Sequence, residues 1–119
     1  MSNNKIVGRY GEDLACDFLQ KHGYTILHRN YQASYKELDI IARKGDFVVF
    51  IEVKTRTSDA FGDGVEAVDY HKQSNLRKAI GYYLVKEQPK SSDVRADLIT
   101  VMIDRGSKNI NIKHFEDVL

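Results

Sequence analysis

The sequence is poor in residues that cross-link or break a chain, with one cysteine, one proline and no tryptophan in 119 residues. One cysteine cannot form an internal disulfide, and a metal site built from several cysteines is excluded for the same reason. No neighbouring residue is placed to lower the pKa of the Cys16 thiol, so we expect Cys16 to pack in a helix rather than to react. This cysteine usage fits a reducing cytoplasm.

Long hydrophobic runs are also missing. The chain has no stretch of about eighteen uninterrupted apolar residues, and its N-terminal segment MSNNKIVGRYGED lacks the apolar core of a signal peptide. We therefore expect a cytoplasmic protein that is neither secreted nor membrane-spanning. With 42% hydrophobic and 29% charged residues, the composition is that of a soluble globular protein. The length predicts one domain over residues 1–119.

An excess of charge of one sign is the third absence. The formal net charge is +1, which argues against the bulk electrostatic attraction by which histone-like and architectural proteins hold nucleic acid. Any binding to a polyanion must then come from local groups of basic residues. A small site of mixed charge remains compatible with this balance.

What the sequence does contain is a regular hydrophobic pattern. Apolar residues recur at helical spacing over residues 8–22 and 69–86. Residues rich in β-branched and aromatic side chains predict strands at 24–32, 36–43, 46–54, 94–104 and 109–115. A tight turn at Lys44 and Gly45 joins the second strand to the third, and a polar loop of about ten residues follows the third. The predicted fold class is α/β, in the order α-β-β-β-α-β-β.

The most apolar of these strands, DFVVFIEVK at residues 46–54, carries two charged side chains. Alternation places Glu52 and Lys54 on one side of it, and it places Glu37 and Asp39 together on one side of the preceding strand. A turn that pairs residue 43 with residue 46 makes Asp39 and Glu52 face the same way. In this register Glu37 lies opposite Glu52, with Asp39 one diagonal step away.

Three converging carboxylates would need a cation among them, because an unpaired buried charge costs several kcal/mol. The candidates are Lys54 alone, or a divalent metal with Lys54 beside it. Carboxylate oxygens without histidine or cysteine suit Mg²⁺ or Mn²⁺, which bind phosphate oxygens and lower the pKa of a bound water. A solvated strand edge, with no chemical role, explains the same charged residues equally well.

The spacing of these charged residues and the predicted order of elements together resemble a known superfamily. Asp39, a spacer of twelve residues and Glu52-Val53-Lys54, on a hairpin within this order of elements, resemble the PD-(D/E)xK nuclease superfamily. The stretches GRYGEDLA at 8–15, HRNYQ at 28–32, ELDIIA at 37–42, FIEVKTR at 50–56 and FG at 61–62 are similar to the YraN-like uncharacterised bacterial family. The resemblance covers nearly the whole chain. It implies a single nuclease-like domain with a restriction-endonuclease-like core, a mixed central sheet flanked by helices.

The resemblance also implies roles for individual residues. Asp39 and Glu52 would be metal ligands, the Val53 carbonyl a further ligand, and Lys54 the catalytic lysine. Glu12, on the first helix, matches an additional acid that some superfamily members place beside the metal. The alternative for Glu12 is a favourable acid in the first turn of a helix.

Other residues are secondary candidates. Lys36 stands where the family commonly has glycine, which leaves Glu37 a secondary candidate for the site. Arg56 continues the side of Glu52 and is a candidate phosphate contact, as is Lys72 on the second helix. Asp97, which interrupts an apolar strand, is expected to be structural.

Three hypotheses for function follow. The first is a Mg²⁺- or Mn²⁺-dependent endonuclease that hydrolyses phosphodiester bonds of DNA, including branched or otherwise structured DNA. The second is an accessory module that keeps the fold and binds nucleic acid without cutting it. The third is a protein that works through protein contacts, with its carboxylates solvated. A homodimer would suit the cutting of two strands, and no membrane partner is expected.

Overall fold

The computed structural model describes residues 2–57, 70–90 and 93–119, and the side chains of residues 2–4 and 70–74 lie outside this description. Two helices and five strands follow one another as predicted: α1 (Ser2–Lys21), β1 (Thr25–Ala33), β2 (Lys36–Lys44), β3 (Phe47–Thr57), α2 (Tyr70–Glu87), β4 (Asp93–Ile103) and β5 (Ile110–Phe115). The predicted order is confirmed. The first helix begins six residues earlier than predicted, and β3 takes in the first three residues of the predicted loop, the rest of which lies outside the described residues.

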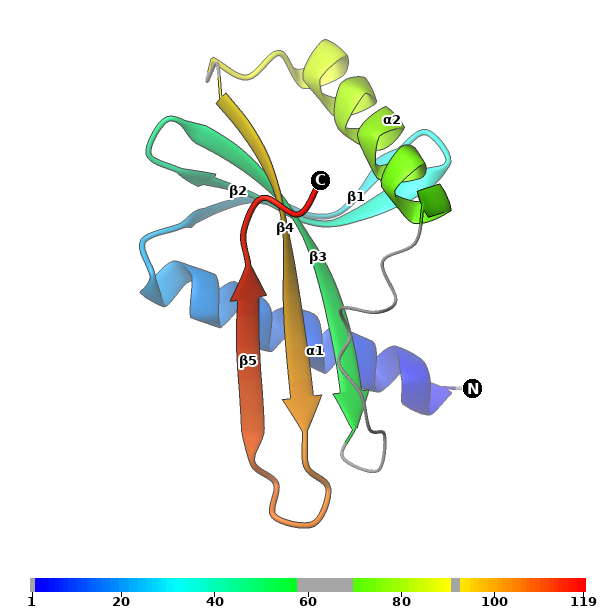
Figure 1. The fold of residues 1–119 in the computed structure, drawn as a ribbon, viewed down its shortest axis with the longest axis vertical. Coiled ribbons are helices and arrows are strands. Elements are labelled where there is room, and N and C mark those ends of the chain that lie inside the picture. The colour runs from blue at the N-terminus through cyan, green and yellow to red at the C-terminus, as the bar shows by residue number, and fades with distance from the viewer. Residues whose placement is uncertain (1, 58–69, 91–92) are drawn as a thin grey trace.

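The strands form one mixed sheet in the order β1-β2-β3-β4-β5. Neighbouring strands are antiparallel except for β3 and β4, which run parallel and are connected through α2. Figure 1 shows α1 crossing one face of this sheet and α2 lying beside the β1–β2 hairpin. Central strands covered on both faces need apolar residues at successive positions, which explains the apolar run in β3.

Each face of the sheet has its own core. Val49 and Ile51 of β3 belong to the core under α1, whereas Val48 and Phe50 belong to the core under α2. Cys16 lies in the α1 core with 7% of its surface exposed, which confirms its predicted packing role. Burial raises the pKa of the Cys16 thiol, as an inert packed thiol requires.

One glycine allows α1 to lie directly on β3. A Cβ built on Gly11 would come within 1.8 Å of Thr55 Oγ1, so only glycine permits this approach. The contact brings the next residue, Glu12, to the part of β3 that follows Glu52. Gly11 therefore connects the packing of the first helix to the position of a candidate site residue.

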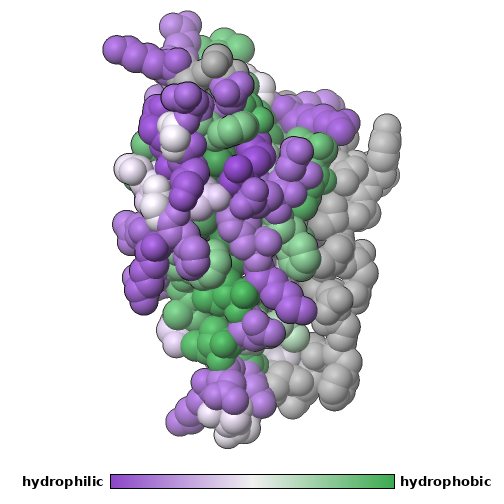
Figure 2. Space-filling model, turned by 60° about the vertical axis from the view of Figure 1, so that its left-hand side comes forward, coloured by the Kyte–Doolittle hydropathy of each residue, from purple (hydrophilic) through white to green (hydrophobic). Residues whose placement is uncertain are grey.

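The face of the molecule drawn in Figure 2 is mostly polar. Figure 2 shows one face of the molecule, on which hydrophilic side chains predominate and hydrophobic ones show through mainly in the lower half. Neither α1 nor α2, the two helices of the described residues, contains a segment apolar enough to cross a bilayer.

The turn between β2 and β3 differs from the prediction. Lys44 pairs with Phe47, so the turn consists of Gly45 and Asp46 rather than Lys44 and Gly45. Gly45 has φ of 58°, and a left-handed first turn residue is what a two-residue hairpin of type II′ requires of glycine. The register is therefore shifted by two positions, and the predicted pairing of Glu37 with Glu52 is wrong.

Candidate functional site

The candidate site lies where β2 and β3 separate. The last pair between these strands is Ile40 with Ile51, and Asp39 and Glu52 are the next residue on each strand. Beyond this point β2 stays paired with β1, while β3 continues along β4. In Figure 1 the β1–β2 hairpin leaves the line of β3, β4 and β5 toward α2. The fork leaves the two carboxylates at an interrupted part of the sheet rather than in a closed ladder.

One hydrogen bond fixes the Asp39 carboxylate at this fork. The Val53 amide donates to Asp39 Oδ2 over 2.9 Å. An amide that could have paired with β2 in a continuous ladder is thus satisfied by a side chain.

The electrostatic environment of Asp39 is unfavourable for its charged form. Burial raises the pKa of Asp39 to about 7, with a further rise from the Glu52 carboxylate and a smaller one from Glu12. The Val53 hydrogen bond and the Lys36 ammonium act in the opposite direction but do not restore the usual value. Asp39 and Glu52 are therefore brought together, as predicted, with Glu12 close enough to act on Asp39.

The described partner of Glu52 is a residue that the sequence did not assign to the site. Lys36 Nζ lies 3.3 Å from Glu52 Oε2, and both side chains are about one quarter exposed. Regular alternation in β2 separates Lys36 from Asp39. The strand is irregular, however: Leu38 and Ile41 both belong to the α2 core, while Ile40 belongs to the α1 core. The only sequence signal for Lys36 was its departure from the family's glycine.

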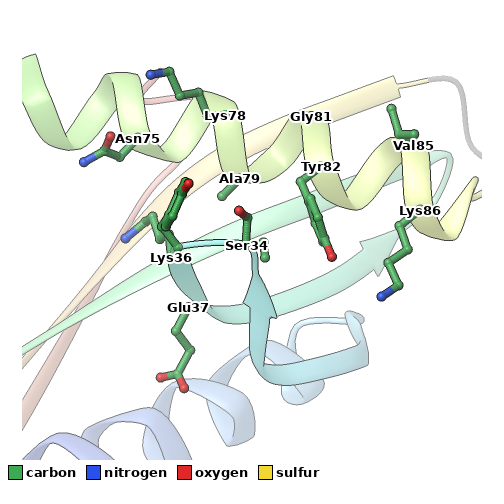
Figure 3. A pocket seen from close by; sticks show the side chains of 12 residues that line it. Ser34, Lys36, Glu37, Asn75, Lys78, Ala79, Gly81, Tyr82, Val85 and Lys86 are labelled. Carbon is green, nitrogen blue, oxygen red and sulfur yellow. The ribbon is translucent and has the colours of Figure 1, made fainter.

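Glu12 and Glu37 are held together by an asparagine. Asn30 Nδ2 donates to Glu12 Oε1 over 3.1 Å and to Glu37 Oε1 over 3.5 Å. Asn30 has φ of 52°, a left-handed conformation that asparagine tolerates better than most residues. Figure 3 shows Glu37 extending from β2 away from α2 and toward α1. Glu37 is thus turned to Asn30 rather than paired with Glu52.

The expected convergence of three carboxylates is wrong. No three histidine, cysteine, aspartate or glutamate side chains among the described residues are grouped so that they could hold one metal ion. The reason is the irregularity of β2 at Asp39, which turns Glu37 toward α1 and Asn30 rather than toward Glu52. The carboxylates that act directly on one another at the fork are Asp39 and Glu52.

The remaining predicted residues lie along β3 and at the start of α2. Lys54 and Arg56 follow Glu52 on β3 at alternate positions, and both are half-buried. Lys72 falls in the first turn of α2, where side chains lie outside the described part of the chain, as do residues 61–62. The structure therefore gathers Asp39, Glu52 and Lys54 on adjacent segments and leaves Lys72 undescribed.

The donor set at the fork fits a hard divalent cation. Mg²⁺ commonly uses one or two protein carboxylates and completes its shell with water and substrate phosphate. Asp39 and Glu52 supply two such groups, and burial together with the Glu52 charge raises the pKa of Asp39 to about 7 despite the nearby Lys36 ammonium. A divalent ion would supply the missing positive charge.

A second aspartate in the sheet has the opposite surroundings. Asp97 is fully buried and accepts hydrogen bonds from Arg95 Nε and Nη2 and from the Asp117 amide. His114 Nε2 lies 2.7 Å from Asp97 Oδ2. Burial alone would raise the pKa of Asp97, but the His114, Arg95 and Asp117 contacts hold it below the usual value. The predicted structural role is confirmed, and the His114 contact is a partner that sequence spacing did not show.

Comparison with known proteins adds a family relationship. The sequence profile of the uncharacterised protein family UPF0102 matches residues 11–101. A UPF0102 protein of Dictyoglomus thermophilum is 44% identical over 106 residues, which are 89% of this chain and 90% of that protein. One from Syntrophomonas wolfei is 41% identical over 91% of this chain and 94% of its own length. One from Clostridium acetobutylicum is 38% identical over 96% and 93% respectively.

Proposed function

Since the chain belongs to the uncharacterised protein family UPF0102, which confirms the resemblance to YraN-like proteins, we propose its function from the geometry of the site. The protein is a metal-dependent endonuclease that hydrolyses phosphodiester bonds of DNA, with Mg²⁺ or Mn²⁺ as its cofactor. The observation that carries this proposal is the Asp39–Glu52 pair at the fork between β2 and β3, whose negative charge is only partly compensated.

Asp39, Glu52 and the Val53 carbonyl hold the metal in this proposal, and Glu12 is the additional acid. The bound ion supplies Lewis acidity for a phosphodiester oxygen and an acidified water. The Val53 amide keeps the Asp39 carboxylate in one orientation, since it occupies Oδ2. Asp39 must be deprotonated to act as a ligand, which the positive charges of Lys36 and of the ion favour.

Lys54 is the catalytic lysine of the proposal. It lies two residues beyond Glu52 on the same strand, so its ammonium stabilises the charge that builds up on the phosphorus oxygens. Arg56 and Lys72 are proposed to contact phosphates on either side of the cut, and they contribute to positioning rather than to bond cleavage. DNA is the proposed partner, and a homodimer would place two such sites on opposite strands.

A second function is favoured by the Lys36–Glu52 ion pair. This pair gives Glu52 a protein cation at 3.3 Å without any metal. A chain that binds nucleic acid and does not cut it would use the same fork as a structural element. Retained DNA binding in EDTA, together with no cleavage in Mn²⁺, would support this accessory module.

Cleavage of DNA by purified variants tests the proposal. Supercoiled, nicked and branched DNA are incubated with Mn²⁺, and products are separated by gel electrophoresis. Asp39→Asn, Glu52→Gln and Lys54→Met should each abolish cleavage while the circular dichroism spectrum stays unchanged.

The matched control is Asp17→Asn, which removes an exposed aspartate of α1 that pairs with Lys21. It should cleave like the wild type, and EDTA should stop both. Undiminished cleavage by a variant that combines the Asp39, Glu52 and Lys54 changes would refute the assignment. Equal loss in the Asp17 variant would show that the activity does not depend on the fork.

A further inference from the structure

A large cavity lies beside the fork, between α2 and the β1–β2 hairpin. It has a volume of about 970 Å³, and we call it the α2–hairpin pocket. Its lining includes Tyr35 and Lys36 of the hairpin and Lys78, Tyr82, Val85 and Lys86 of α2. Figure 3 shows Tyr82 extending from α2 toward the hairpin, with Lys86 one turn further along the helix. A volume of this size is typical of ligand sites.

Aromatic and apolar side chains are unusually exposed here. Tyr35 is fully exposed, Val85 is 76% exposed and Tyr82 is 38% exposed. Eight large hydrophobic side chains are exposed in the part of the chain that the structure describes, and three of them line this one pocket. The other five are spread over α1, β3, β4 and β5. Exposed apolar surface that gathers in one concavity is typical of a binding site.

The charge at the pocket is positive. Lys36, Lys78 and Lys86 line it, and the one carboxylate in the lining, Glu37, is engaged by Asn30 and turned toward α1. Lys86 Nζ also lies 5.8 Å from the centre of the Tyr82 ring. A local basic group of this kind is what a chain of nearly zero net charge needs in order to hold a polyanion.

The pocket is continuous with the fork through one side chain. Lys36 lines the pocket and also lies 3.3 Å from Glu52. A ligand in the pocket that extends past Lys36 therefore arrives at Asp39 and Glu52. The ligand must combine flat apolar groups with repeated negative charge.

We propose that the α2–hairpin pocket binds unpaired nucleotides of a single-stranded nucleic acid segment. The bases stack on Tyr35 and Tyr82, and the phosphates lie against Lys78 and Lys86, a combination that single-strand-binding sites share. A base pair inside a duplex cannot use these tyrosines because its faces are already stacked on its neighbours. The delivery of the strand to the fork for cutting rests on the proposed function, whereas binding in the pocket does not.

Fluorescence anisotropy with a labelled oligothymidylate tests the proposal, in EDTA so that no cleavage occurs. The wild type should bind this single strand more tightly than a blunt duplex of the same length at the same salt concentration. Tyr35→Ala and Tyr82→Ala should each weaken single-strand binding about tenfold, the effect of losing one stacked base. Tyr35→Phe and Tyr82→Phe keep the ring and should bind within twofold of the wild type.

Tyr10→Ala is the matched control, because Tyr10 is 47% exposed on α1 and lies outside the pocket. It should bind like the wild type. Unchanged binding in both pocket alanine variants, or equal loss in the Tyr10 variant, would overturn the proposal. Two measurements on the wild type separate the two ideas: single-strand binding in EDTA together with no cleavage of DNA in Mn²⁺ would leave the pocket in place and remove the proposed function.

Discussion

Two aspartates interrupt the apolar strands of the same sheet, and their surroundings are opposite. Asp97 of β4 has no exposed surface, and it is in contact with Arg95, His114 and the Asp117 amide. Asp39 of β2 accepts one hydrogen bond from the Val53 amide and faces the carboxylate of Glu52. The pKa of Asp97 is held below its usual value, while burial and Glu52 raise that of Asp39 to about 7.

The two aspartates differ in how far neighbouring groups compensate their negative charge. The partners of Asp97 come from β4, β5 and the segment after β5, so it joins these parts of the chain. Its negative charge is compensated by these contacts within the protein. Among the described residues, the Lys36 ammonium and the Val53 hydrogen bond lower the pKa of Asp39 but do not return it to the usual value. A buried acid with too few cations costs stability, and such a cost is typical of residues kept for binding or chemistry.

The largest predicted effect is the loss of the compensated aspartate, Asp97. Asp97→Asn removes the charge that compensates Arg95, whose side chain is 15% exposed, and should lower the free energy of unfolding by about 3–5 kcal/mol. Urea denaturation at neutral pH measures this change. The matched control is Glu116→Gln, because Glu116 is the exposed partner of the same arginine at 3.6 Å. It should cost less than about 1 kcal/mol, and equal losses in the two variants would contradict a structural role specific to Asp97.

The next prediction concerns Asp39, whose negative charge is only partly compensated, and the expected change in the free energy of unfolding has the opposite sign. Asp39→Asn should raise the free energy of unfolding at pH 8 by about 2–4 kcal/mol without metal, because it removes a half-buried charge beside Glu52. The wild-type Asp39 has a folded pKa of about 7, above the value of 3.8 for the free side chain. Its favourable contribution is therefore present below about pH 4 and is lost as the pH rises through 7.

Urea denaturation of the wild type and Asp39→Asn across pH 4 to 8 checks this dependence. The stability difference between them should vanish near pH 4 and grow toward pH 8. Asp97 should show no loss over this range, since its pKa is lowered and its contribution fades only under more acidic conditions. A constant difference between Asp39→Asn and the wild type would show that Asp39 is as well compensated as Asp97.

A smaller effect is expected from a substitution in α1 that changes the surroundings of Asp39 and not those of Asp97. Gly11→Ala places a methyl group 1.8 Å from Thr55 Oγ1, so α1 must shift from β3 at a cost of about 1–3 kcal/mol. The shift takes Glu12 away from Asp39 and should lower the Asp39 pKa, while the Asp97 contacts stay unchanged. Gly8→Ala is the control, because nothing lies within 4 Å of its added methyl group. That variant should gain up to about 1 kcal/mol, and a similar gain for Gly11→Ala would contradict the close approach.

Much of this architecture follows from local pattern in the sequence. The apolar run of β3, its alternation and the short link to β2 are enough to predict the hairpin and the nearness of Asp39 to Glu52. Asp39 and Glu52 face the same way in the predicted and in the observed register, because a shift of two positions keeps the same faces together. The predicted turn could therefore be misplaced while the main pair of the site was still identified.

The rest depends on features that a local pattern does not contain. Regular alternation fails in β2 at Asp39, where Leu38 and Ile41 share a face, and this irregularity brings Lys36 to Glu52. The left-handed conformation of Asn30 directs its amide to Glu12 and Glu37 in the same way. His114 meets Asp97 only because β5 pairs with β4. Each of these partners is set by the strand pairing of the folded sheet.

The metal site is tested most directly by diffraction from crystals soaked in Mn²⁺, with the ion located by its anomalous scattering. We expect one ion bound by oxygens of Asp39 and Glu52 at about 2.0–2.2 Å, and no ion there in crystals of Asp39→Asn. We also expect no ion at Asp97, whose charge is already used by Arg95 and His114. A fork without manganese at saturating concentration, with Lys36 still paired to Glu52, would show that Asp39 and Glu52 do not form a metal site.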